Sequence, residues 1–238
     1  MTSFLNNIVH LKSIDSTNDY LVRLYKKYDF KKELVVIANE QTSGRGRIGK
    51  TWFSDINSLT FSLSKIVDSK FNMWSINIIT GLAVIHALSK YNIKALIKYP
   101  NDIIIRNKKI AGILTDVIHV RKQKYCVIGI GINVNNNVFP KQLSMVTSIK
   151  NILSNNIDVN NLLHMILLEL DKIFNKDLDF LLYCHHLYGF KNYVPCIYNN
   201  CRIYVKILTI NQDGSLLILT DKGAEHQLND VDIKFLLD

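Results

Sequence analysis

One segment combines glycines with cationic side chains: Gly44-Arg45-Gly46-Arg47-Ile48-Gly49-Lys50-Thr51. Glycine lets a backbone approach an anion closely, and arginine and lysine neutralise its charge. The segment fits the phosphate-binding pattern G-x-x-x-x-G-K-[ST], which works only between a strand and the N-terminus of a helix. The residues after Thr51 predict a short turn and an alternating strand, so we interpret this match as accidental. The composition still predicts an anion-binding loop; the alternative is an exposed, flexible basic loop.

Three more groups carry chemically useful residues. In Lys98-Tyr99-Pro100-Asn101-Asp102, the proline fixes φ and lacks a donor, and the Asn-Asp pair favours a turn. Lys109 opens an apolar run to Leu114, which predicts an ammonium group at the mouth of a strand; the alternative is a surface lysine whose stem covers apolar surface. The segment Gly129-Ile130-Gly131-Ile132-Asn133 predicts a strand that a ligand can approach closely.

Hydrophobic periodicity predicts the elements that must position these groups. Ser16 with Asp19 predicts a start like a capping box for a helix over Thr17–Tyr28. Further helices are predicted at Trp74–Tyr91, Asn160–Phe174 and Leu178–Tyr188. Strands are predicted at Leu34–Ala38, Ser58–Lys65, Leu96–Lys98, Ile103–Arg106, Ala111–Val117 and Tyr125–Asn133.

The chain has 238 residues, 48% of them hydrophobic and 21% charged, which indicates one large globular domain or one domain with a small appendage. After Phe190, short strands and turn signals predict a small β-barrel-like unit, so we expect domains at 1–190 and 191–238. The 29 Lys and Arg against 20 Asp and Glu give a net charge of +9, but the charges are scattered and only weakly favour anionic partners.

Membrane, export and metal signals are weak or missing. The longest apolar stretch, near 76–88, is interrupted by polar residues and is shorter than the roughly 18 residues a membrane span needs. Residues 1–13 lack the pattern of an export signal, so we expect a cytoplasmic protein with reduced thiols. No metal site is expected, because the spacing of the cysteines fits no standard zinc pattern. They are Cys126, Cys184, Cys196 and Cys201.

Five motifs in this order and spacing resemble those of biotin–protein ligases, and the resemblance covers nearly the whole chain. They are Ser16-Thr17-Asn18, Gly44–Arg47 with Trp52, Lys98–Asp102, Lys109–Leu114 and Gly131-Ile132-Asn133. The resemblance implies an α+β fold: a mixed sheet with packed helices, related to class II aminoacyl-tRNA synthetases, followed by a small SH3-like β-barrel. Many relatives have tryptophan where this chain has Tyr99, and arginine where it has Lys50.

The resemblance also implies a reaction. Members of the family join biotin to ATP, which carries Mg²⁺, to form biotinyl-5′-AMP. They then pass the biotinyl group to one lysine of a biotin carboxyl carrier protein, a domain of biotin-dependent carboxylases such as acetyl-CoA carboxylase. A carboxylate is a poor electrophile, so such a site needs cations where carboxylate and phosphate meet, and a loop that excludes water.

Roles for individual residues follow from the resemblance. It implies catalytic roles for Lys109, Arg47 and Asp102. It implies biotin binding by Ser16, Thr17, Asn18, Gln41, Arg45, Gly46, Arg47, Lys109 and Gly112. It implies nucleotide binding by Arg47, Trp52, Asn101, Lys109 and Asn133.

Some relatives begin with a winged-helix DNA-binding domain. The first motif of this chain lies at Ser16, so we expect a ligase that is not a repressor, with no specific DNA partner and no membrane partner. The oligomeric state, with a homodimer among the options, stays open. Two alternatives also remain: a lipoate– or octanoate–protein ligase of the same superfamily, and an RNA-binding module, which only the pI near 9.3 supports.

Overall fold

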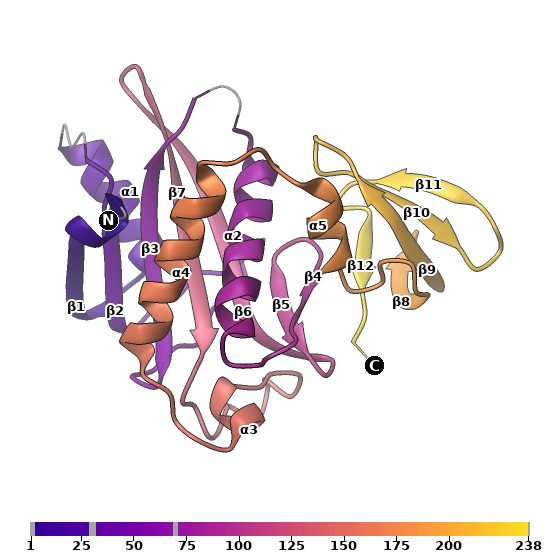
Figure 1. Cartoon of the computed structure of the whole chain (residues 1–238), viewed down its shortest axis with the longest axis horizontal. Helices are drawn as coiled ribbons and strands as arrows, with labels where there is room; N and C mark the ends of the chain where they lie inside the picture. The colour runs from indigo at the N-terminus through magenta and orange to yellow at the C-terminus, as the bar shows by residue number, and fades with distance from the viewer. Residues whose placement is uncertain (1–2, 29–31, 69–70, 238) are drawn as a thin grey trace.

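The computed structural model describes residues 3–28, 32–68 and 71–237. Its larger part is a seven-stranded mixed sheet in the order β1-β2-β3-β7-β6-β5-β4 (Figure 1). The strands are β1 Ile8–Ile14, β2 Val35–Gln41, β3 Ser58–Ile66, β4 Leu96–Lys98, β5 Asp102–Ile105, β6 Lys108–Val120 and β7 Gln123–Asn133. β1 pairs with β2 in parallel, and the other neighbours pair antiparallel.

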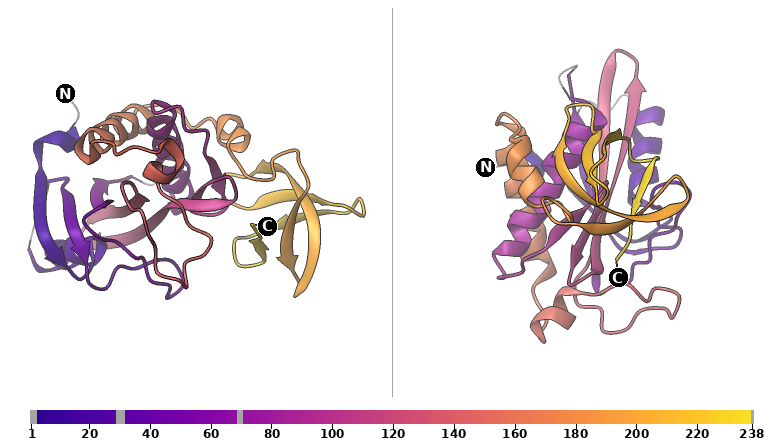
Figure 2. Two further views of the ribbon diagram at one scale, coloured as in Figure 1. Left: turned by 90° about the horizontal axis from the view of Figure 1, so that it is seen from below. Right: turned by 90° about the vertical axis from the view of Figure 1, so that its right-hand side faces the viewer.

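Helices cover both faces of this sheet. They are the short 3₁₀ helix η1 Ser3–Asn6, then α1 Thr17–Lys27, α2 Met73–Ser89, α3 Ile149–Leu153, α4 Val159–Phe174 and α5 Phe180–His185. Adjacent strand residues point to opposite faces, so Val35 joins the main core under α2 and α4 while Val36 joins a smaller core under α1. Figure 2 shows α1 on one side of the sheet and α2 with α4 on the other.

Most predicted elements are confirmed, with shifts at their ends. Leu96–Lys98 is a strand as predicted, and the helix predicted to Tyr28 ends at Lys27. The strand predicted at Ala111–Val117 is the middle of the longer β6, because cross-strand bonds to β7 extend it to Val120. The helix predicted at Leu178–Tyr188 is helical only over Phe180–His185, where Asp179 caps it. β1 and α3 were not predicted.

The C-terminal segment forms a second, antiparallel sheet. Its strands are β8 Val194–Tyr198, β9 Cys201–Ile210, β10 Leu216–Thr220, β11 Glu225–Leu228 and β12 Ile233–Phe235, in the order β11-β10-β9-β8-β12. In the described part of the chain, the strand pairing leaves β11 and β12 as the outer strands of this sheet, in the segment where a small SH3-like barrel is expected. One apolar core runs from the large sheet into this one, and the boundary at residues 190 and 191 stays a prediction.

The two sheets meet at the corner after β4. The Tyr99 ring stacks on Trp74 with ring centroids 5.4 Å apart, and it meets Phe235 of β12 edge-on. The Tyr99 hydroxyl donates to the Gly214 carbonyl oxygen at 2.9 Å. Gly214 has φ of +87°, and a Cβ there would lie 2.0 Å from the Trp74 indole, so a side chain at this position would force this turn and the indole of α2 apart. In the described part of the chain, no helix is both long and apolar enough to cross a membrane.

Candidate active site

A cleft of about 710 Å³, its open mouth included, lies where the start of α1 meets strands β3, β5, β6 and β7. Predicted residues that line it are Ser16, Thr17, Asn18, Gln41, Arg45, Gly46, Arg47, Trp52, Asn101, Asp102, Lys109 and Gly112. Asn133 does not line the cleft: it is buried, and its Nδ2 donates to the Thr147 carbonyl oxygen at 3.0 Å.

One end of the cleft is a largely buried network of polar groups, all neutral except Asp116, which pairs with Arg45. The backbone nitrogen of Thr17 donates to Oε1 of Gln41 at 2.8 Å, and the Thr17 hydroxyl lies 2.6 Å from that of Ser62. The Ser62 hydroxyl donates to Oδ1 of Asn18 at 2.5 Å, and Nδ2 of Asn18 donates to Asp116 at 3.0 Å. Each bond fixes the direction of the next donor or acceptor, so this end is built to match a neutral polar group.

Local sequence places this network. Ser16 is the N-cap of α1, as predicted, and its hydroxyl accepts from the Asp19 backbone nitrogen at 3.3 Å. The reciprocal half of the predicted capping box is wrong. The Ser16 backbone nitrogen donates to Asp15 at 2.7 Å, while the Asp19 carboxylate pairs with Arg45 at 2.8 Å. The acidic group at the helix start therefore holds the glycine-arginine loop.

That loop is folded as a closed turn over the cleft. The Gly46 backbone nitrogen donates to the Lys50 oxygen at 2.6 Å, and the Trp52 nitrogen donates to the Gly44 oxygen at 2.8 Å. Gly44 is required here, because a Cβ on it would lie 2.4 Å from the Trp52 carbonyl oxygen. The residues after Trp52 lead into β3 without a helix, which confirms that the P-loop pattern match is accidental.

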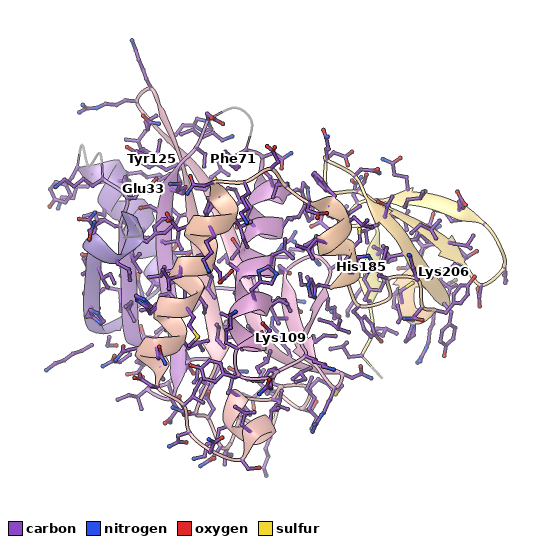
Figure 3. All side chains as sticks on the ribbon, viewed as in Figure 1. Glu33, Phe71, Lys109, Tyr125, His185 and Lys206 are labelled. Carbon is purple, nitrogen blue, oxygen red and sulfur yellow. The ribbon has the colours of Figure 1, made fainter. Side chains whose placement is uncertain are left out.

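The other end of the cleft is cationic. Lys109 Nζ lies 2.5 Å from Asp102 Oδ1 and 5.3 Å from the centre of the Trp52 ring; Figure 3 labels Lys109 on β6. Lys98, which we did not predict as a site residue, lies 3.8 Å from the Asp102 carboxylate. Burial lowers the pKa of Lys98, and nearby Lys109, Lys50 and Lys234 lower it further while Asp102 opposes them. A concentration of positive charge at this end favours an anion.

Three buried polar atoms of the cleft residues have no hydrogen-bond partner in the described part of the chain. They are Nη1 of Arg47, Nε1 of Trp52 and Oγ1 of Thr60. Buried polar groups are nearly always paired, so a cleft with three unpaired ones is suited to a polar ligand. Thr60, Ser62 and Asp116 were not predicted as site residues from the sequence. The one sequence feature that could have indicated them is a polar or acidic residue within a predicted strand.

Glycines in β6 and β7 let the backbone of these strands lie very close to the side chains of Trp52 and Asn18. Cβ atoms on Gly131 and Gly112 would lie 2.3 Å and 3.1 Å from the Trp52 indole, and a Cβ on Gly129 would lie 2.2 Å from Oδ1 of Asn18. The indole thus lies directly against β6 and β7, and Lys109 Nζ is 5.3 Å from its centre. A cleft with this division has the form of an active site for a small molecule with a neutral polar head and an anionic end.

Comparison with known proteins agrees with the fold. Residues 10–133 match the model of the biotin/lipoate A/B protein ligase family, and the chain belongs to this family. It is 31% identical over 204 residues to the bifunctional ligase/repressor BirA of Bacillus subtilis, a match that covers 80% of this chain and 63% of that protein. It is 33% identical over 108 residues to the biotin–[acetyl-CoA-carboxylase] ligase of Mycobacterium tuberculosis, covering 42% of this chain and 39% of that one.

Among solved structures, the biotin protein ligase of Aquifex aeolicus in complex with biotin and ATP superimposes with a TM-score of 0.80. The two chains are 26% identical, and the match covers 98% of this chain and 99% of the other. The biotin protein ligase of Leishmania major in complex with biotinyl-5-AMP shares the fold, with a TM-score of 0.62 at 22% identity over 94% of this chain and 98% of that one.

Proposed function

We propose that the chain is a biotin–protein ligase. It joins biotin to ATP as biotinyl-5′-AMP and then transfers the biotinyl group to one lysine of a biotin carboxyl carrier domain. The observation that carries the proposal is the division of one cleft into a buried neutral network at Thr17, Asn18 and Gln41 and a cationic end at Arg47 and Lys109. Biotin has the matching form, with a neutral ureido head and a carboxylate tail.

In the first step, a carboxylate oxygen of biotin attacks the α-phosphorus of ATP, and pyrophosphate leaves with the electrons of the broken bond. Lys109 and Arg47 offset the negative charge that accumulates where carboxylate and phosphate meet. Mg²⁺ enters with ATP as part of that substrate, and Asp102, a carboxylate of the cleft lining 2.5 Å from Lys109 Nζ, would help to hold it. Asn101 and Trp52, which line the cleft, bind the nucleotide.

In the second step, the amine of the carrier lysine attacks the carbonyl carbon of the mixed anhydride, and AMP leaves with its phosphate oxygen. The anhydride reacts with water, so the closed loop of residues 44–52 protects it until the carrier arrives. The carrier domain belongs to a biotin-dependent carboxylase, and the reaction takes place in the cytoplasm. The relative from Mycobacterium tuberculosis, a biotin–[acetyl-CoA-carboxylase] ligase, supports this class of carrier.

The nearest alternative is a lipoate–protein ligase, since the family includes both activities. The head of lipoate is an apolar dithiolane ring, which would leave the polar groups of Thr17, Gln41 and Asn18 facing an apolar surface. The dithiolane ring would shield this network from water without offering it any hydrogen bond, whereas the ureido head of biotin adds donors and an acceptor, and this difference favours biotin. The polar network at the head end therefore distinguishes the two acids.

The test is incorporation of labelled biotin into a carrier domain, with and without ATP, in parallel with labelled lipoate. We expect ATP-dependent labelling by biotin alone. A binding assay with biotin, lipoate and RNA side by side extends the test to the RNA-binding alternative. Incorporation of lipoate in place of biotin, or binding of RNA without binding of either acid, would contradict the proposal.

A glycine substitution tests the head end by itself. In Gly129→Ala, the new Cβ would meet Oδ1 of Asn18 at 2.2 Å, so Asn18 must move and the network with Ser62 must break. We expect affinity for biotin to fall about tenfold, a change of about 1.4 kcal/mol, because the displaced Asn18 no longer faces the head of biotin. Titration calorimetry with biotin alone measures this.

Gly81→Ala on α2 is the matched control. Its Cβ would meet only side-chain atoms, the nearest at 3.1 Å, and it lies outside the cleft lining. We expect this variant to bind biotin like the wild type. A folded Gly129→Ala protein with unchanged affinity would mean that Asn18 does not contact biotin.

A further inference from the structure

The loop arginine Arg47 is bonded to the C-terminal sheet. Its Nη2 donates to Oδ2 of Asp230, a residue 183 positions away in the turn between β11 and β12 (Figure 1). Both side chains are largely buried, with 22% of Arg47 and 14% of Asp230 exposed. The C-terminal sheet thus reaches the catalytic cleft through one carboxylate.

Only part of the Arg47 guanidinium is used in this bond. Its Nη1 is buried and has no partner among the residues that the structure describes. Arg45, the neighbouring arginine of the same loop, differs: its Nη2 lies 2.8 Å from both Asp19 and Asp116. A guanidinium has five donors on one rigid plane, so a bond at one nitrogen fixes the direction in which the others point.

The turn that carries Asp230 is itself ordered. The Asn229 backbone nitrogen donates to the Asp232 carboxylate at 2.9 Å, and the Asp232 nitrogen donates to the Asn229 oxygen at 3.1 Å. The sheet behind it is attached to the large sheet by the Tyr99 bond to Gly214. Asp230 is therefore presented to the loop from a fixed position.

We infer that Asp230 is a positioning residue of the adenylation site: it holds Arg47 by one nitrogen so that the unpaired Nη1 is presented to a phosphate oxygen of the bound adenylate. The inference rests on the proposed function. Arginine stays protonated whatever its partner, so Asp230 directs the charge of Arg47 without removing it. The C-terminal sheet then contributes to retention of the intermediate.

The experiment uses purified biotinyl-AMP and the full chain with Asp230→Asn. The asparagine is nearly the same size but cannot make the charged bond, so we expect biotinyl-AMP to dissociate about ten times faster. Affinity for biotin alone should stay within about twofold, because Asp230 lies outside the network at the head end. Asp221→Asn, which removes an exposed carboxylate from the neighbouring turn of the same sheet, is the matched control and should leave both values unchanged.

A double variant distinguishes positioning from general loosening of the sheet. If Asp230 acts through Arg47, adding Asp230→Asn to Arg47→Ala will not change the dissociation rate by more than about twofold. The inference would be overturned if Asp230→Asn raised the dissociation rate of biotinyl-AMP by the same factor in the Arg47→Ala variant as in the wild type. Slower dissociation from Asp230→Asn would also overturn it, because Asp230 would then compete with the phosphate. If the proposed function itself is wrong, the wild type will not bind biotinyl-AMP at all, which is a different result.

Discussion

Replacement of Lys109 by alanine is expected to reduce the rate of biotin adenylation at least about a hundredfold while the fold remains intact. Loss of one donor to a developing negative charge costs about 3 kcal/mol in comparable sites, which corresponds to roughly that factor. Lys109 Nζ lies at the cationic end, 2.5 Å from Asp102 and 5.3 Å from the centre of the Trp52 ring. The measurement is ATP-dependent formation of biotinyl-AMP under single-turnover conditions.

Lys108→Ala is the matched control, since it removes the same charge from the preceding residue. Lys108 is exposed and does not line the cleft, so its rate should equal that of the wild type. Thermal unfolding of both variants checks the fold. Near-normal adenylation by a folded Lys109→Ala protein would contradict the catalytic role of this lysine.

The second large effect concerns Arg47→Gly and retention of the intermediate. We expect biotinyl-AMP to dissociate at least about tenfold faster from this variant, a larger change than that in its rate of formation. Two causes combine: the variant loses the guanidinium beside the phosphate, and a further glycine raises the entropic cost of ordering the loop. Escaped adenylate should then label lysines on unrelated proteins. The dissociation rate and labelling of added serum albumin measure the two consequences.

Ile48→Gly separates these causes. This substitution places the additional glycine at the residue after Arg47 and keeps every cation of the loop. Ile48 has φ of +53°, a backbone conformation that glycine adopts readily. We expect its dissociation rate to stay close to that of the wild type. Proteolysis provides a second probe, because we expect biotinyl-AMP to protect residues 44–51 from cleavage. An unchanged dissociation rate for Arg47→Gly, or equal protection with and without ligand, would identify the loop as a static turn.

What sequence alone determined depends on local interactions. Ser16 caps α1 because its hydroxyl needs only a donor three residues away, and the strand at Leu96–Lys98 is followed by a corner that Pro100 enforces. The alternation in β3 identifies its apolar core residues, Leu59, Phe61 and Leu63, but the half-buried strand that it predicts is wrong, because the polar residues Thr60, Ser62 and Ser64 between and after them are buried as well. The five motifs also predicted which segments meet, and all but Asn133 of the predicted site residues line one cleft.

Only the tertiary structure decided which residues that are far apart in the sequence are in contact. Arg45 meets Asp116 across 71 positions, and Arg47 meets Asp230 across 183, and neither carboxylate lies in a motif. The neighbouring residues in the sequence do not distinguish Asp230 from Asp221, an exposed aspartate in the preceding turn. The difference arises because Tyr99 bonds to the Gly214 carbonyl oxygen and contacts Phe235, which fixes the C-terminal sheet beside the loop. Pairing of strands and packing of sheets depend on the whole chain, so the partner of Arg47 became known only with the fold.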